Sequence, residues 1–397
     1  MQTSAAQQPL CPSVQKPTPN ASAKPAKRFG NIDAMRFIFS IAIVYYHILH
    51  YNIMPFVAKT PVYTDLSHVS VASAWAVEFF FILGGLFLYR TYRAKPSLTI
   101  AEFTYDKLIR LWPVLFFMFI LDYFTFRAHN IFQTLINLLF LQNSGLSLNQ
   151  SGSAWYISPF FLISVFYFAL LKKFDNRKLN LVIIVLVYLA YTLNINFTAG
   201  KFSRIEVGYV INLGMVRGIG GIGLGYLLGL AYDRLSAMKL KRDLIPNATV
   251  RKWVVFAILS VLEVLCLYLL LKNALAGDIY NNQIVIIILF CILLMCFLVN
   301  KGIVSLLFNH RIFSILGSYS YSIYIMQDVG LRLLKKTMWL DTDYLVHHAY
   351  RVIALSILII TAIGIATYYL VEKPCLKLGQ YIKRTYLFPK PGEEKAR

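Results

Sequence analysis

The chain has 397 residues, of which 58% are hydrophobic and only 14% are charged, yet its formal net charge is +21. A soluble globular protein carries nearer a quarter charged residues, so this composition excludes an ordinary cytosolic enzyme and a disordered protein. A strongly basic chain can bind nucleic acid, and the positions of the charges along the sequence decide that question.

Apolar stretches long enough to cross a bilayer as helices recur along the whole chain. We expect about ten, at residues 34–53, 71–90, 108–128, 153–172, 180–196, 208–232, 252–272, 282–300, 312–334 and 352–371. The apolar segment 131–142 is too short to span and is expected to be re-entrant or interfacial. Because the apolar runs are continuous and not alternating, the sequence predicts an all-α, polytopic membrane bundle.

Lys and Arg are concentrated in alternate loops. Segments 1–33, 91–107, 173–179, 233–251, 301–311 and 372–397 hold about 24 of them, whereas 54–70, 129–152, 197–207, 273–281 and 335–351 hold about 6. The positive-inside rule therefore places both termini in the cytoplasm. Basic loops beside anionic lipid account for most of the positive charge, so we expect no nucleic-acid binding.

The two ends of the chain differ in composition from the rest. Residues 1–30 are rich in Pro, Ala, Ser, Gln and Lys, which predicts a disordered cytoplasmic tail and no signal peptide. We expect a transmembrane domain over 31–376 and a short basic tail over 377–397. The 5 cysteines include none in an external loop, so neither a structural disulfide nor a metal site is expected.

Ionisable residues inside membrane spans are costly, which makes those of the first span informative. Arg36 and His47 are separated by three helical turns, so they share one face, about 16 Å apart along the axis. This spacing indicates a cavity with a cation at its cytoplasmic mouth and a general base within, because histidine titrates near working pH. The alternative is structural, with Arg36 snorkelling and His47 hydrogen-bonded in the bundle.

Other charged residues extend this pattern. Glu78 is expected at the depth of His47, where a carboxylate would fix the imidazole tautomer; the alternative is a structural ion pair. Lys107 and Arg110 begin the third span on one face, and they either serve topology alone or bind the phosphate of an anionic cofactor. Arg217 lies mid-membrane and needs an acidic partner or an anion.

Two spans have unusual side chains. The span SILGSYSYSIYIMQDVG is strongly polar, so some of its hydroxyls are expected to join helices and others to line a substrate path. The span that contains Arg217 carries Gly221, Gly225 and Gly229, a small-residue ridge for close helix packing. We expect no strand before these glycines, so they are not interpreted as a dinucleotide-binding motif.

Six segments occur in the order NIDAMRFIFSIAIVYYH, VEFFFILGG, YDKLIRLWP, MVRGIGGIGLG, SYSYSIYIMQ and VEKP. Together they resemble the motifs of the acyltransferase-3 family of integral membrane acyltransferases, over most of residues 29–374. The first has that family's Arg, ten residues, then His. The chain departs from the family pattern with Gly84 for Ser, Lys107 for Arg and Gln327 for a frequent His. SAWYISPFF keeps the family's Trp as Trp155 without the acid that often follows.

The resemblance implies transfer of an acyl group, most often acetyl, from cytoplasmic acyl-CoA to a hydroxyl of a glycan such as a surface or exopolysaccharide precursor. It assigns catalysis to His47, Glu78 and Arg36, and it implies no metal. The residues assigned to CoA binding are Arg36, Arg90, Lys107 and Arg110. The residues assigned to acceptor binding are Arg217, Tyr321, Tyr324, Gln327 and Trp155. His47 is interpreted as the general base that deprotonates the acceptor, and an acyl-His intermediate is the alternative.

Transport is the main alternative function. A flippase or an export subunit for a lipid-linked sugar or polysaccharide would use intramembrane charges and a polar span equally well. No internal repeat relates 34–172 to 180–371, which favours an enzyme. We expect a bacterial inner-membrane location, with membrane lipid, a glycan acceptor and polysaccharide-synthesis proteins as partners.

Overall fold

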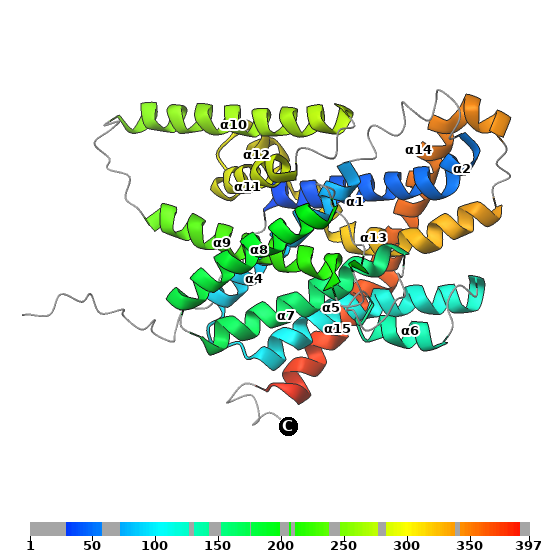
Figure 1. Ribbon diagram of the computed structural model, residues 1–397, viewed down its shortest axis with the longest axis horizontal. Coiled ribbons are helices and arrows are strands. Elements are labelled where there is room, and N and C mark those ends of the chain that lie inside the picture. Colours follow the sequence, from blue (N-terminus) through cyan, green and yellow to red (C-terminus); the bar gives the residue numbers. More distant parts are fainter. Residues whose placement is uncertain are drawn as a thin grey trace, which may run out of the picture.

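The structure is a computed structural model that describes residues 29–57, 72–126, 131–142, 152–174, 176–198, 206–207, 211–237, 247–276, 283–337 and 342–389. These residues are helical apart from short connections and one hairpin, in which β1 (Glu206–Val207) pairs antiparallel with β2 (Ile211–Asn212). Figure 1 shows the helices packed as a bundle, with α10 along one edge.

The long helices follow the predicted spans. They are α1 (Gly30–His47), α4 (Ala72–Ala94), α5 (Ile100–Leu121), α7 (Ile157–Lys173), α8 (Asn176–Thr198), α9 (Leu213–Ala237), α10 (Ala248–Ala276), α11 (Gln283–Val299), α13 (Arg311–Thr337) and α14 (Thr342–Thr367). The short elements are η1 (Ile48–Ile53), α2 (Met54–Val57), η2 (Asp122–Phe126), α6 (Ile131–Leu138), η3 (Gly152–Tyr156), α12 (Ile303–Phe308), η5 (Tyr368–Glu372), α15 (Lys373–Ile382) and η6 (Lys383–Leu387). Each predicted span coincides with a helix, and the short segment 131–142 contains α6.

Within the described residues, 7 helical stretches are long and apolar enough to cross a membrane. They are Gly30–Phe56, Ile100–Thr125, Ala154–Lys173, Arg177–Thr198, Leu213–Ala237, Ala248–Leu275 and Asp343–Leu387. Helix α11 is also apolar but has only 17 residues. Helices α4 and α13 are not among the seven, and α13 carries the polar Ser and Tyr run. The prediction of an all-α, polytopic membrane bundle is confirmed, although fewer than ten helices meet both criteria.

The predicted C-terminal tail, 377–397, begins within a helix. The predicted boundary at residue 376 lies inside a helical stretch that continues from α14 through α15 to Leu387. The Tyr105 hydroxyl donates to the Gly379 carbonyl at 3.1 Å, and Lys383 pairs with Asp106 at 2.7 Å. These contacts pack α15 and η6 against α5. The predicted N-terminal tail, 1–30, lies almost wholly outside the described residues.

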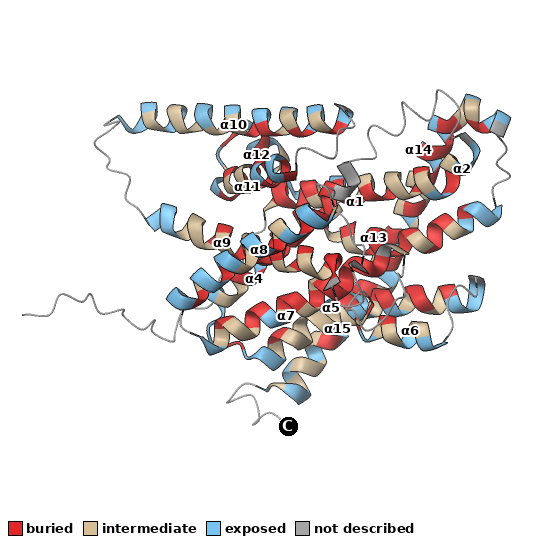
Figure 2. Ribbon diagram, in the orientation of Figure 1, coloured by how far each residue is buried: buried red, intermediate tan, exposed pale blue. Residues whose placement is uncertain are grey.

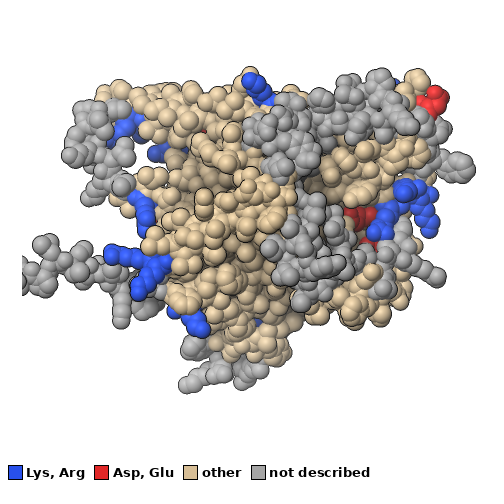
Figure 3. Space-filling view, in the orientation of Figure 1, with Lys and Arg blue, Asp and Glu red and all other residues tan. Residues whose placement is uncertain are grey.

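Burial and charge both match a bundle surrounded by lipid. Figure 2 shows buried residues concentrated where α1, α4, α7, α9 and α13 meet, whereas much of α8 and α10 is exposed. The exposed positions are apolar, as at Leu181 (66% exposed) and Val261 (64%). Figure 3 shows Lys and Arg mainly at two opposite edges of the visible face, with few between them. An apolar belt between charged ends is what a bilayer requires.

Helices α4 and α9 approach each other at glycines, in keeping with the predicted small-residue ridge. A Cβ atom at Gly85 would lie 1.9 Å from the carbonyl oxygen of Ile222, and one at Gly225 would lie 1.8 Å from that of Ile82. Backbone atoms cannot turn aside as a side chain does, so both positions require glycine. This close packing sets α9 against the face of α4 that carries Glu78.

We expect Gly225→Ala to destabilise the detergent-solubilised protein by roughly 1–3 kcal/mol, as overpacked positions do. Gly220→Ala is the matched control on the same helix, because its Cβ would meet the Tyr191 ring at 3.3 Å, and a side chain can move. Thermal unfolding of the two variants measures the difference. Equal midpoints would show that α4 and α9 do not need this contact.

Candidate functional site

Helices α1 and α13 pack along each other and carry two predicted site residues on their shared face. The Arg36 guanidinium donates to the Ser320 hydroxyl at 3.2 Å. Further along, His47 Nδ1 lies 3.0 Å from Gln327 Oε1. Ser320 and Gln327 are two turns apart on α13, so both contacts lie on one side of that helix. The structure thus places Arg36 and His47 on one face of α1, as their spacing indicates.

Gln327 fixes the state of the His47 ring. In this orientation of the amide, Oε1 accepts from His47 Nδ1–H, which leaves the basic lone pair on Nε2. Gln327 is fully buried, and the Tyr51 ring stacks on the imidazole with centroids 5.7 Å apart. The hypothesis that Glu78 orients His47 is therefore corrected, since the residue at Nδ1 comes from α13 and not from α4.

Glu78 has other partners. Its carboxylate accepts from the Tyr191 hydroxyl at 2.6 Å and from Arg217 Nε at 3.3 Å. Both ion-pair side chains are buried, and the Arg217 guanidinium also lies over the Trp155 ring at 5.6 Å. Arg217 therefore has the acidic partner that its depth requires, and Glu78 matches the alternative of a structural ion pair.

Three of the four predicted CoA-binding cations gather at the other end of the α1–α13 face. Arg110 interacts electrostatically with both Arg36 and Lys107. Lys107 Nζ lies 4.2 Å from the centre of the Phe160 ring. Arg90 is apart from this cluster: among the described residues its guanidinium contacts the Phe29 ring, at 4.5 Å.

Two buried acids balance these cations. Asp33 Oδ1 pairs with Arg36 at 2.8 Å. Glu372 is 2% exposed, accepts from the Ser322 hydroxyl at 2.6 Å, and interacts electrostatically with Arg110 and Arg36. Asp33 thus holds Arg36 through a direct ion pair, whereas Glu372 acts on Arg36 and Arg110 only through longer-range attraction.

The predicted acceptor residues do not form one group. Tyr324 packs edge-on against Tyr156, with centroids 6.0 Å apart, and interacts electrostatically with Arg217. Tyr321 instead donates to the Leu111 carbonyl on α5 and interacts with Glu372 and Arg110. Tyr321 therefore lies at the cation cluster, apart from Tyr324.

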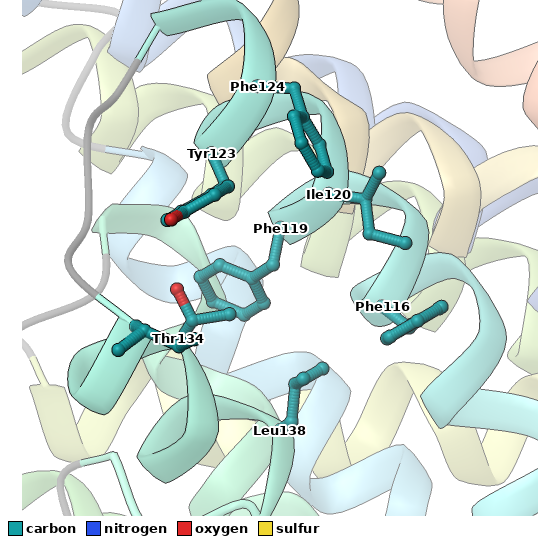
Figure 4. Close-up of a pocket in the computed structure, with 8 residues that line it drawn as sticks. Phe116, Phe119, Ile120, Tyr123, Phe124, Thr134 and Leu138 are labelled. Atoms are coloured by element: carbon teal, nitrogen blue, oxygen red, sulfur yellow. The ribbon is translucent and has the colours of Figure 1, made fainter.

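A groove of about 200 Å³ lies outside this site, between the end of α5, η2 and α6. Figure 4 shows Phe116, Phe119, Tyr123 and Leu138 around it. Its other lining residues are Ile120, Phe124, Ile131 and Thr134. None of these residues is charged, and Phe124 and Ile131 are 77% and 68% exposed, so the groove faces the lipid side.

Sequence reasoning missed several partners. Asp33 was identifiable, because an acid three residues before Arg36 on a helix is a recognised pairing distance. Tyr191 and Tyr156 could not be identified as site residues from the sequence, since a tyrosine in an apolar span is as often a lipid-facing or core residue as a functional one. Glu372 stood in a family-like motif, but its position beside Arg36 and Arg110 depends on how α14 and α5 pack.

The described fold is that of a polytopic helical membrane protein with ionisable side chains gathered inside the bundle. Residues 29–371 match the family model of the acyltransferase-3 acyltransferase domain. This match covers most of the chain, so the chain belongs to the acyltransferase-3 family and is a membrane acyltransferase. No curated protein and no solved structure matches the chain.

Proposed function

We propose that the protein transfers an acyl group, acetyl in the simplest case, from acyl-CoA to a hydroxyl of a glycan such as a surface or exopolysaccharide precursor. The α1–α13 face carries this proposal. The face has a cation cluster at one end and His47 at the other. This arrangement suits a long donor whose anionic end binds the cations while its thioester lies at the base.

The donor phosphates are assigned to Arg36, Lys107 and Arg110. Guanidinium groups bind phosphate oxygens through paired, charge-assisted hydrogen bonds. Asp33 keeps Arg36 oriented in the absence of donor, which lowers the ordering cost of binding. Arg90, which lies over Phe29, is left out of this set.

The chemical step uses His47 Nε2. It removes the proton of the acceptor hydroxyl as the oxygen attacks the thioester carbonyl. Collapse of the tetrahedral intermediate breaks the carbon–sulfur bond, and the imidazolium returns its proton to the CoA sulfur. The products are an ester and free CoA. Gln327 stabilises the imidazolium through Nδ1–H, a role that Glu78 was predicted to play.

We place both termini in the cytoplasm and the protein in a bacterial inner membrane. The loop asymmetry of about 24 against 6 Lys and Arg supports this orientation. It sets the cation cluster at the side from which acyl-CoA arrives. His47 then lies toward the outer half of the membrane, where a glycan precursor can reach it.

Purified protein supplied with acetyl-CoA and a panel of oligosaccharides tests the function. We expect CoA release that depends on the saccharide, with the ester detected by mass spectrometry. Saccharide flux into vesicles without CoA release would overturn the proposal and favour a flippase or exporter.

We expect Arg110→Glu to weaken CoA binding by roughly tenfold or more, because one charge-assisted contact contributes about 1.5–3 kcal/mol. The salt dependence of binding should also fall. Lys173→Glu is the control, since Lys173 is an exposed cation at the end of α7. Calorimetric titration with CoA at two salt concentrations measures both effects. Equal affinities for the two variants would remove Arg110 from the donor site.

A further inference from the structure

The apolar groove between the end of α5, η2 and α6 has the dimensions of a hydrocarbon chain. It follows the helix from Phe116 to Phe124, which is about 12 Å along the axis. That length is most of the roughly 15 Å half-thickness of the hydrocarbon core of a bilayer. Its volume of about 200 Å³ is below the roughly 300–1,000 Å³ of a pocket for a small molecule. The groove therefore fits a segment of one chain better than a compact ligand.

Contacts between α5 and α6 form this groove. The Trp112 ring stacks on Phe116, with centroids 4.7 Å apart, and its Nε1 donates to the Leu138 carbonyl at 3.2 Å. Phe116 and Leu138 both line the groove, so this hydrogen bond holds its two walls together at one end. Because the lining carries no charge and is open on the lipid side, the surrounding membrane is the source of an occupant.

The other end of the groove lies beside cations of α13. Arg332 Nε pairs with Asp122 Oδ1 at 3.5 Å, and Asp122 directly precedes the groove residue Tyr123. Lys335 and Lys336 follow three and four residues after Arg332, on the same face of the helix. The Arg332 side chain is 38% exposed, and both lysines are exposed. Figure 1 shows the ends of α13 and α5 at one edge of the bundle, where Figure 3 shows Lys and Arg gathered.

The two lysines supply the excess positive charge of this cluster. The charge of Arg332 is offset by Asp122, its ion-pair partner, and by Asp328, which lies one turn earlier on α13 and interacts electrostatically with Asp122. In the part of the chain that the structure describes, no acid pairs with Lys335 or Lys336. Both ammonium groups are therefore available to an anion.

These lysines also depart from the charge pattern of the loops. With both termini in the cytoplasm, the external segments hold about 6 Lys and Arg in all, and Lys335 and Lys336 are two of them. The positive-inside rule disfavours cations in a short external segment. An adjacent pair at the end of an apolar groove therefore indicates a function other than topology.

An apolar groove that ends at exposed lysines matches a ligand with an apolar tail and an anionic head. We propose that the groove binds an anionic phospholipid of the surrounding membrane, with one acyl chain between α5 and α6 and the phosphate at Lys335 and Lys336. Burial of the chain and attraction of the headgroup both favour this complex. The bound lipid joins α6 to α13, the helix that carries Gln327.

Lipid-dependent thermal stability of the full chain in detergent tests the headgroup contact. Dioleoyl phosphatidylglycerol should raise the thermal midpoint of the wild type more than dioleoyl phosphatidylcholine, which has no net charge. Lys335→Gln with Lys336→Gln should lower the affinity for phosphatidylglycerol roughly tenfold or more and remove the preference between the lipids. Lys172→Gln with Lys173→Gln is the matched control, because these are also adjacent exposed lysines at a helix end, and it should keep the preference.

A variant that fills the groove tests the chain contact. Thr134→Trp places a large ring at a lining position, so it should reduce the midpoint shift caused by either lipid. Leu181→Trp on α8 is the matched control, since Leu181 is 66% exposed at an apolar position outside the groove, and it should leave both shifts unchanged. Native mass spectrometry counts the lipids that stay bound, so a variant with a lower starting midpoint still gives a result.

Three outcomes would overturn the proposal. Equal shifts for the two lipids in the wild type would show that the site does not select an anionic headgroup. Unchanged phosphatidylglycerol binding in the double lysine variant and in Thr134→Trp would place the lipid elsewhere. A dimer that Thr134→Trp converts to a monomer would show that a second copy of the chain occupies the groove. None of these measurements requires acyl transfer, so they remain decisive even if the proposed function is wrong.

Discussion

Replacing His47 with alanine is expected to lower kcat for acyl transfer by roughly 10²–10⁴-fold, the contribution of a positioned general base. CoA affinity should stay the same, because the cation cluster lies at the other end of the α1–α13 face. Rates of ester formation and calorimetric CoA binding, measured on the same preparation, test both statements. Full activity in a correctly inserted His47→Ala protein would remove His47 from the mechanism.

A milder variant removes only the hydrogen bond between His47 Nδ1 and Gln327. Gln327→Met keeps the volume but removes the group that fixes the tautomer, so we expect a smaller loss of kcat than in His47→Ala. The pH profile should also change, because the imidazolium loses its stabilising acceptor. An unchanged profile would show that Gln327 does not orient the base.

The same proteins distinguish the two roles open to His47. Acid quenching during turnover, followed by mass spectrometry of the peptide that contains His47, detects an acylated imidazole. We expect none, since a base that transfers only a proton forms no covalent intermediate. A trapped acyl-His47 would make the histidine a nucleophile, and Gln327 would then orient the attacking ring.

The sequence predicted best what depends on one helix at a time. Hydropathy placed the spans, since a membrane helix must be continuously apolar, and helical spacing put Arg36 and His47 on one face. The glycines of α9 also predicted close packing correctly. Each of these features follows from residues within a few turns of one another.

The sequence could not predict which helices are neighbours, and the partners of the charged residues depend on that. Equal depth made Glu78 a reasonable partner for His47, but α4 packs against α9, so Glu78 meets Arg217. His47 meets Gln327 because α1 packs on α13. Arg90 has the same charge as Arg110 and is predicted for the same side of the membrane, but it packs against Phe29 and lies apart from the cluster.

The buried pair of Glu78 and Arg217 leads to the second large effect. Glu78→Gln leaves the Arg217 charge uncompensated in the interior, which costs about 3–5 kcal/mol. We therefore expect a large fall in thermal stability and in the amount of inserted protein. Asp233→Asn is the control, because the Asp233–Arg93 pair is 44% and 65% exposed and such pairs contribute little. Equal stability of the two variants would contradict a structural role for Glu78.

A double variant separates structure from catalysis at this pair. Glu78→Gln with Arg217→Met removes both charges, so most of the lost stability should return. We expect acyl transfer to remain low. Glu78 interacts electrostatically with Tyr156, as Arg36 does, and Arg217 interacts with Tyr324, so removing the charges of Glu78 and Arg217 changes the electric field inside the site. Recovery of full activity together with stability would limit Glu78 and Arg217 to joining α4 and α9. Recovery of stability alone would place the pair among the groups that position the site.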